Sequence, residues 1–208
     1  MSETTLLDGS IGQELVKRSD DRATPLWSTQ VMIDYPGMVG DVHRDYFAAG
    51  ATVATTNTYA VHRSRLERVG LEDQMGMLLD AALGQAEAAR NSNEGTRVAG
   101  ALGPLLASYR PDLKPEVGFA AERFADIANR MQGRVDLLLG ETVSSLQEAE
   151  GLFEGVAHID LPLWIAFSVD DQEGNKLRSG EALADILPLI SRYKPAAVLL
   201  NCSTPAPI

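Results

Sequence analysis

Apolar residues along the chain fall into two alternating patterns, short continuous runs and longer stretches with a helical period. The short runs are rich in Val, Leu, Ile and Ala, and several are apolar throughout rather than alternating with polar residues. Continuous apolar runs of this length are typical of parallel strands that are covered on both faces. The pattern therefore predicts six strands, at residues 4–7, 51–56, 97–102, 135–139, 163–168 and 196–200.

Helices are predicted between these strands. Residues 72–90 form a long Ala-rich stretch, residues 110–115 read as a loop, and a further helix should begin near Glu116. Ser145 and Glu148 have the spacing of a capping box at the start of another helix. Three apolar faces have helical spacing: Val39, Val42, His43, Tyr46 and Phe47; Leu146, Ala149, Phe153 and Val156; and Leu183, Ile186, Leu187 and Ile190.

Alternating strands and helices predict an α/β fold with a parallel sheet, either open and doubly wound or closed into a barrel. A doubly wound nucleotide-binding fold should carry a glycine-rich fingerprint after an early strand. Residues 8–13 (DGSIGQ) lack the G-x-G-x-x-G spacing, and no Walker A motif is present. A (β/α)8 TIM-type barrel is therefore favoured, as one domain over residues 1–208. Six of its eight units are visible, so either the barrel is incomplete in this chain or the fold is smaller.

Composition narrows the classes of function. The 208 residues carry 29 acidic and 18 basic side chains, a net charge of −11, which disfavours binding to nucleic acid and to anionic membranes. No apolar run reaches the roughly 18 residues of a membrane span, and residues 1–10 do not resemble a signal peptide. The single cysteine excludes an internal disulfide. We expect a cytoplasmic protein with no nucleic-acid or membrane partner.

Polar side chains follow the predicted strands where each strand ends. The carboxyl ends of the strands in a parallel barrel meet at one face, which is where such enzymes place their chemistry. Carboxylates there could hold an ammonium group, and a thiol could act as a nucleophile or as a ligand for a soft metal. The candidates are Asp8, Gly9, Thr56, Asn57, Glu141 and Cys202.

Each candidate also has a purely structural interpretation. Asp8 before a glycine suits a turn, a lone cysteine is often an inert buried residue, and residues 56–58 could cap the helix that follows them. His43 is interpreted as a core residue whose hydrogen bonds are satisfied. A carboxylate directly after an apolar strand, as at Glu141, is costly unless it is paired, which favours a functional role.

Taken together, several segments resemble the homocysteine S-methyltransferase family, which includes betaine- and S-methylmethionine-dependent enzymes and the homocysteine module of cobalamin-dependent methionine synthase. They occur in the family's order over nearly the whole chain. The matching segments are residues 7–15 (LDGSIGQEL), 43–51 (HRDYFAAGA), 55–59 (TTNTY), 100–104 (GALGP), 136–142 (DLLLGET) and 201–202 (NC).

The resemblance implies a (β/α)8 barrel in which three cysteines hold a catalytic zinc, the first of them corresponding to Cys202. The zinc would bind the sulfur of homocysteine as a thiolate, which attacks a small methyl donor to give methionine. S-methylmethionine, betaine and methylated folate or corrinoid are the donor classes that the family implies.

The family motifs also imply the remaining site residues. Glu141, in the Glu-Thr motif, would hold the amino group of homocysteine, with Asp8 and Gly9 beside it. Thr56 and Asn57 would line the end of the pocket that receives the amino acid.

The sequence departs from the family at the metal site. The other two zinc ligands are an adjacent Cys-Cys pair in a Gly-Gly-Cys-Cys motif downstream of the first cysteine, and this sequence has one cysteine in all. Three explanations remain open: a truncated form of a longer enzyme, a second chain that supplies the missing ligands, or a protein that has lost the chemistry.

Three hypotheses follow. The leading one is an enzyme of methyl transfer to homocysteine. The alternative is a catalytically incomplete amino-acid-binding module, or a subunit that needs a partner chain for its zinc site. In the third, an open six-strand barrel exposes unpaired strand edges and aggregates or pairs with another copy, as a homo-oligomer.

Overall fold

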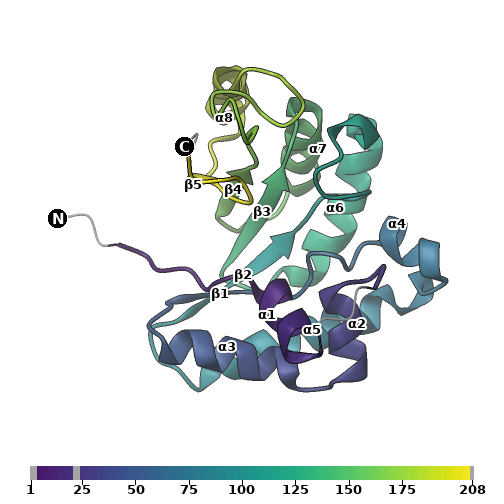
Figure 1. Cartoon of the computed structure of the whole chain (residues 1–208), viewed down its shortest axis with the longest axis vertical. Coiled ribbons are helices and arrows are strands. Elements are labelled where there is room, and N and C mark those ends of the chain that lie inside the picture. The colour runs from purple at the N-terminus through teal and green to yellow at the C-terminus, as the bar shows by residue number, and fades with distance from the viewer. Residues whose placement is uncertain (1–3, 21–23, 207–208) are drawn as a thin grey trace. The chain divides into compact units, whose positions relative to one another are not determined.

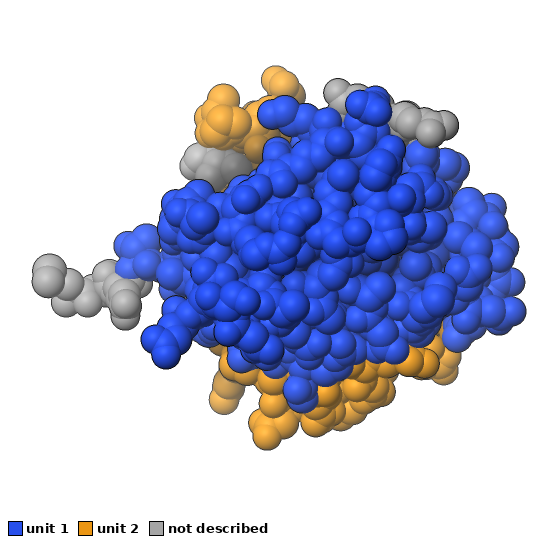
Figure 2. Space-filling view, turned by 90° about the horizontal axis from the view of Figure 1, so that it is seen from below, with its two compact units in different colours: residues 1–101, 133–136 blue, residues 102–132, 137–208 orange. Residues whose placement is uncertain are grey.

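The computed structural model describes residues 4–20 and 24–206. The chain forms an α/β fold with two compact units, coloured separately in Figure 2. Unit 1 comprises residues 1–101 and 133–136, and unit 2 comprises residues 102–132 and 137–208. All strand pairs within each unit are parallel, which confirms the predicted fold class.

Unit 1 contains two strands and the helices of the first half of the chain. Its helices are α1 (Ile11–Arg18), α2 (Ser28–Asp34), α3 (Met38–Ala48), α4 (Arg63–Leu66) and α5 (Met75–Asn91), with 3-10 turns at Glu67–Val69 and Glu72–Gln74. Strands β1 (Val53–Thr55) and β2 (Arg97–Leu102) pair in parallel, and α3 and α5 lie side by side against β1 (Figure 1).

The first predicted strand is much shorter than expected. Only Leu7 makes a parallel bridge, to Val53 of β1, flanked by hydrogen bonds from Thr52 N to Leu6 O (2.8 Å) and from Asp8 N to Val53 O (3.0 Å). Leu6 is 53% exposed, so this segment gains too little burial to extend the pairing. Asp8 nevertheless follows the bridge directly, as predicted.

Unit 2 contains three strands and the remaining helices. Strands β3 (Leu137–Val143), β4 (Leu163–Phe167) and β5 (Ala197–Leu200) are parallel neighbours in chain order. The helices are α6 (Val117–Met131), α7 (Leu146–Val156) and α8 (Leu187–Tyr193), with 3-10 turns at Pro111–Leu113 and Leu183–Ile186. Helix α7 packs on α6 and on β3 (Figure 1).

Small residues set the distance between α6 and α7. A Cβ atom on Gly155 would lie 2.6 Å from Ala121 O and 2.8 Å from Phe124 Cβ, and one on Gly151 would lie 2.5 Å from Ala120 Cβ. Helix α7 begins with a variant of the predicted capping box. Ser145 Oγ accepts from Glu148 N (3.2 Å), but the Glu148 carboxylate accepts from Ser144 N (2.9 Å), one residue before the N-cap.

The predicted helical face at residues 183–190 is wrong. Leu183–Ile186 is a 3-10 turn, and α8 starts only at Leu187 because Pro188 occupies the first turn of the helix. The change from three to 3.6 residues per turn breaks the apolar stripe. Leu187 is consequently 60% exposed, whereas Ile186 is buried.

No helix in the described part of the chain is long and apolar enough to cross a membrane.

Candidate functional site

The end of β3 is irregular, and the irregularity falls on the Glu-Thr pair. Gly140 pairs with Ile165 and Val143 pairs with Phe167, so Glu141 and Thr142 together face one residue of β4. This is a β-bulge, a feature that re-aims side chains next to functional sites. Thr142 has φ +60°, a conformation that is strained for a β-branched residue. The predicted strand 135–139 therefore continues through a distorted end that carries Glu141.

The strained Thr142 is buried and held by neighbouring polar groups. Its backbone N donates to Asn201 Oδ1 (3.1 Å), and its carbonyl accepts from Ser144 Oγ (3.1 Å). Asn201 Nδ2 donates to Thr142 Oγ1 (3.4 Å), and Thr142 Oγ1 in turn donates to Cys202 Sγ (3.5 Å). The ends of β3 and β5 are thus joined through the side chains that flank Glu141 and Cys202.

Cys202 is an exposed free thiol at a turn that begins directly after β5. Its φ is +51°, so Cys202, like Thr142, has a left-handed backbone conformation. Ser168 Oγ, just after β4, donates to Asn201 O (3.1 Å), and Val169 N donates to Ser203 Oγ (2.9 Å). The alternative interpretation of Cys202 as an inert buried residue is therefore wrong.

An ion pair fixes the other side of this turn. Arg178 Nη2 donates to Cys202 O (3.0 Å) and to the Asp171 carboxylate (2.9 Å), which also accepts from Thr204 N (2.9 Å). These bonds lower the pKa of Asp171, the Thr204 N–H first and the Arg178 guanidinium second. The guanidinium also lies over the Tyr109 ring, 5.0 Å from its centroid. The backbone of Cys202 is held independently of its side chain.

The described residues fit a zinc ion only in part. A zinc site takes three or four protein ligands, and a thiolate is one of the preferred kinds. Cys202 supplies one such ligand, but residues 4–20 and 24–206 contain no group of three or more His, Cys, Asp or Glu side chains that could hold a metal. A complete zinc site therefore needs ligands beyond those that this part of the chain brings together.

In unit 1, Asp8 is a buried carboxylate whose pKa is strongly raised. Its carboxylate accepts from Thr55 N (2.6 Å) and from Thr55 Oγ1 (2.7 Å). Burial nevertheless dominates and raises the pKa of Asp8 to about 6, although both Thr55 bonds lower it. A carboxylate with this pKa still carries its charge at neutral pH and could bind an ammonium group.

Glycines beside Asp8 allow aromatic rings to approach the backbone. A Cβ atom on Gly9 would lie 2.6 Å from the Tyr46 hydroxyl oxygen, and one on Gly12 would lie 2.1 Å from the Trp27 ring. Trp27 also makes an edge-to-face contact with Tyr59, with centroids 5.9 Å apart. Gly9 is therefore needed for space beside the Tyr46 ring.

Thr56 and Asn57 are buried, and their side chains form hydrogen bonds with backbone groups. Thr56 Oγ1 accepts from Ala101 N (2.9 Å), Thr58 Oγ1 donates to Ala101 O (2.7 Å), and the two hydroxyls are 2.8 Å apart. Asn57 Nδ2 donates to Ser28 O (3.2 Å). Helix α4 starts later, at Arg63, so the interpretation of residues 56–58 as its cap is wrong.

His43 is a core residue, as predicted, but its hydrogen bonds are not satisfied. The ring is fully buried in α3, and among the described residues neither nitrogen has a hydrogen-bond partner. Burial, assisted by the charge of Arg44, lowers the pKa of His43 to about 4. The ring is therefore neutral at physiological pH.

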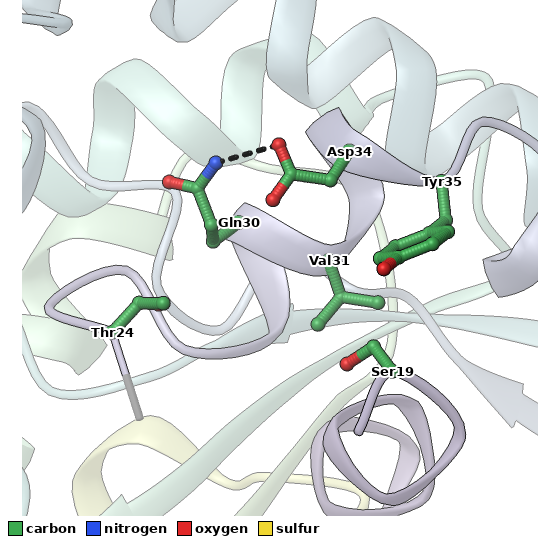
Figure 3. Close-up of a pocket in the computed structure, with 6 residues that line it drawn as sticks. All are labelled: Ser19, Thr24, Gln30, Val31, Asp34 and Tyr35. Atoms are coloured by element: carbon green, nitrogen blue, oxygen red, sulfur yellow. Dashed lines mark hydrogen bonds between the residues drawn. The ribbon is translucent and has the colours of Figure 1, made fainter. Parts of the chain in front are cut away.

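A small hollow lies between the end of α1 and α2 (Figure 3). Its volume is about 180 Å³, which suits a few waters rather than an amino acid. Gln30 donates to Asp34 across its rim (2.9 Å). The other residues that line it are Ser19, Thr24, Val31 and Tyr35.

The sequence motifs assign no role to the groups that hold the candidate residues. Thr55, Thr142 and Asn201 lie inside these motifs, which carry no signal for the contacts that the three residues make. Arg178, more than twenty residues before Cys202, had no sequence signal that connected it to the thiol, because its contact with the Cys202 carbonyl depends on the turn after β5.

Comparisons with known proteins identify the same family that the motifs resemble. The profile of the homocysteine S-methyltransferase family matches residues 5–208. A homocysteine S-methyltransferase of Escherichia coli is 32% identical over 95% of this chain, which spans 68% of that protein. The homocysteine S-methyltransferase YbgG of Bacillus subtilis is 28% identical over 95% of this chain, which spans 69% of that protein. The chain thus spans about two thirds of the length of these relatives.

Solved structures give the same result. The metallated form of the homocysteine methyltransferase MmuM from Escherichia coli matches with a TM-score of 0.86 and 28% identity, over 97% of this chain and 75% of that one. The oxidized form of MmuM matches with a TM-score of 0.83 and 30% identity, over 97% and 74% of the two chains.

Proposed function

Because the chain belongs to the homocysteine S-methyltransferase family of methyltransferase enzymes, we propose that it transfers a methyl group from a small donor to the sulfur of homocysteine, giving methionine. S-methylmethionine, betaine and a methylated folate or corrinoid are the donor classes to test.

The observation that carries this proposal is the junction at the ends of β3 and β5. Glu141 precedes Thr142, whose hydroxyl contacts Cys202 Sγ at 3.5 Å. Homocysteine carries an ammonium group and a thiol. A carboxylate suits the ammonium group, and a thiolate is a ligand for the soft metal that would activate the substrate sulfur. This pair of groups matches the two ends of the substrate.

The remaining candidates have supporting roles in the proposal. In unit 1, Asp8 is the carboxylate proposed to attract an ammonium group, and Gly9 leaves room for the Tyr46 ring beside it. Thr56 and Asn57 are buried and already hydrogen-bonded, so they shape the wall of the amino-acid site by holding the loop after β1.

Zinc is the proposed metal, with Cys202 as one ligand. When bound, zinc lowers the thiol pKa of homocysteine so that the sulfur reacts as a thiolate at neutral pH. Support for a metal comes from Cys202 as a soft donor and from the metallated form of MmuM. The described residues contain no group of three or more possible metal ligands that would supply the other ligands of the zinc.

Methionine formation tests the proposal. The chain is incubated with homocysteine, zinc and each donor in turn, and methionine is measured by mass spectrometry. We expect Glu141→Gln to lower kcat/KM for homocysteine by roughly 10- to 100-fold, the value of a hydrogen bond to a charged group. Cys202→Ser should abolish turnover.

The matched control for Glu141 is Glu94→Gln, which neutralises an exposed carboxylate in the loop after α5. It should leave kcat/KM unchanged. Absence of methionine with every donor, from folded and zinc-supplied protein, would refute methyl transfer by this chain.

A second function, an amino-acid-binding module or a subunit that needs a partner chain, is favoured by one observation. The described residues bring one thiol to the end of β5, and they form no group of three or more His, Cys, Asp or Glu side chains that could hold a metal. Calorimetric titration with homocysteine in the absence of zinc separates the two functions. Binding without turnover favours the module, and no heat at millimolar ligand rejects it.

A further inference from the structure

The hydrogen bonds around the thiol of Cys202 determine whether the Thr142 hydroxyl donates or accepts. Thr142 Oγ1 lies 3.5 Å from Cys202 Sγ, and Asn201 Nδ2 lies 3.4 Å from the same Oγ1. A hydroxyl has one proton to donate, whereas a carboxamide nitrogen can only donate. Since Asn201 Nδ2 donates to Oγ1, the hydroxyl proton of Thr142 is directed towards the sulfur.

The orientation of the Asn201 carboxamide is itself determined. Its Oδ1 accepts from Thr142 N (3.1 Å), and a backbone N–H can only donate. A flipped amide would therefore place its NH2 group against this N–H. The amide nitrogen therefore faces Thr142 Oγ1, and the direction of the whole chain of hydrogen bonds follows.

The strained backbone at Thr142 indicates that the surrounding structure requires a threonine in this conformation. A β-branched residue at φ +60° is strained, and it persists only where its surroundings determine it. A glycine or asparagine would adopt this conformation more easily. Threonine places a hydroxyl on the thiol, which neither of those residues would do in the same way.

We propose that Thr142, oriented by Asn201, is a positioning residue that donates its hydroxyl proton to Cys202 Sγ and holds the sulfur in one rotamer as a hydrogen-bond acceptor. This inference rests on the proposed function, in which Cys202 is a metal ligand. Partners that orient a metal ligand from behind raise its affinity for the metal, typically by 10- to 100-fold.

The backbone and the side chain of Cys202 are held by different groups. Arg178 Nη2 and Ser168 Oγ bind the carbonyls of Cys202 and Asn201, whereas Thr142 Oγ1 binds the sulfur. Removal of the Thr142 hydroxyl should therefore free the thiol to rotate about χ1 while the turn itself keeps its shape.

The rotamer of this thiol can be measured directly, because the chain contains one cysteine. Protein grown with 13C-labelled cysteine gives one set of Cα–Cβ signals in NMR, and the two Hα–Hβ couplings report χ1. One rotamer gives either one large and one small coupling or, at χ1 near +60°, two small couplings. Averaging over rotamers gives two couplings of intermediate size. The measurement is made on reduced, metal-free protein, so it does not depend on zinc or on turnover.

We expect the couplings of one rotamer in the parent and intermediate, averaged couplings in Thr142→Val, which keeps the shape but loses the hydroxyl. Thr142→Ser, which restores the hydroxyl, should restore the couplings of one rotamer. Thr204→Val is the matched control, since the Thr204 hydroxyl lies near the same turn but donates to Asp171 O. Thr142→Ala, which relieves the β-branched strain, replaces Thr142→Val if that variant does not fold.

The couplings of one rotamer in a folded Thr142→Val or Thr142→Ala variant would overturn the proposal, because the backbone alone would then fix the thiol. Averaged couplings in the parent would overturn it as well. Absence of methionine formation by the parent, with the couplings as expected, would refute the proposed function and leave the positioning of Cys202 by Thr142 intact.

Discussion

At the scale of single residues, unit 1 contains two buried ionisable groups with opposite effects on stability. Burial raises the pKa of Asp8 to about 6 and lowers the pKa of His43 to about 4. As pH rises from about 4 to 6, the unfolded chain releases the Asp8 proton before the folded chain does, so the free energy of unfolding falls. Over about pH 4 to 6.5, the unfolded chain alone carries a proton on His43, so this residue makes the free energy of unfolding rise with pH. The two effects largely cancel.

Single substitutions should expose each effect. In Asp8→Asn the free energy of unfolding should rise more steeply between about pH 4 and 6 than in the parent, because only the His43 effect remains. In His43→Leu it should fall over the same range. Each difference should be of the order of 2 kcal/mol, since one pKa unit corresponds to about 1.4 kcal/mol. Urea denaturation at a series of pH values measures both.

Asp34→Asn, which alters an exposed carboxylate of α2, is the control for these variants. It should keep the pH dependence of the parent. Parallel curves for Asp8→Asn and the parent would contradict the raised pKa of Asp8.

The raised pKa of Asp8 also predicts how substrate affinity varies with pH. The charged carboxylate attracts an ammonium group and the protonated form does not, so homocysteine affinity should fall as pH drops through about 6. Calorimetric titrations at pH 5 and pH 7 should differ by roughly 10-fold in Kd, as expected for a group with this pKa. Asp8→Asn should bind weakly and equally at both values, and an unchanged pH dependence in that variant would exclude Asp8 as the responsible group.

At the scale of elements, the contact between α6 and α7 depends on two glycines of α7. An added methyl group on Gly155 meets the Ala121 carbonyl at 2.6 Å, and backbone cannot rotate away as a side chain can. The same substitution at Gly118, in the first turn of α6, meets nothing within 4 Å. The two positions therefore separate the packing effect from helix propensity.

We expect Gly155→Ala to destabilise the protein by about 1–3 kcal/mol through overpacking. Gly118→Ala should be neutral or stabilising by up to about 1 kcal/mol, because alanine is the better helix former. Thermal and chemical denaturation of both variants test this. Equal stability of the two variants would mean that α6 and α7 separate more easily than their packing indicates.

At the scale of the whole molecule, the number of metal ligands that the chain supplies sets its affinity for zinc. The sequence has one cysteine, and the described residues group no three metal ligands. Affinity for zinc rises with the number of ligands that a site supplies. The chain belongs to a family in which MmuM has a metallated form. Its own described residues offer one thiol as a ligand.

We expect the purified chain to retain much less than one zinc per molecule after dialysis, measured by metal analysis together with intact mass. Addition of homocysteine should raise the zinc content, because its thiol is a second soft ligand. Cys202→Ser should remove this increase, and Ser203→Ala, at the neighbouring position, should keep it. One tightly held zinc per chain without substrate would show that other ligands complete the site.

The sequence by itself determined the parallel α/β class and the place of most elements. Continuous apolar runs predicted β2 with its observed bounds, and the helical period predicted α3 and α7, because burial on one or two faces leaves a periodic trace in the residues themselves. The position of Cys202 after its strand followed from the same pattern, whereas Glu141, predicted to follow its strand, lies within the distorted end of β3. Family motifs added the expected chemistry of the two residues.

Tertiary structure decided the rest. The bulge at Glu141 and Thr142 arises from the register of β3 against β4, and the contact of Thr142 with Cys202 depends on β5 lying beside β4. Likewise, the pKa values of Asp8 and His43 depend on how deeply the packed unit buries them. Such features are set by residues far apart in the chain, so no local pattern of hydrophobic and polar positions records them.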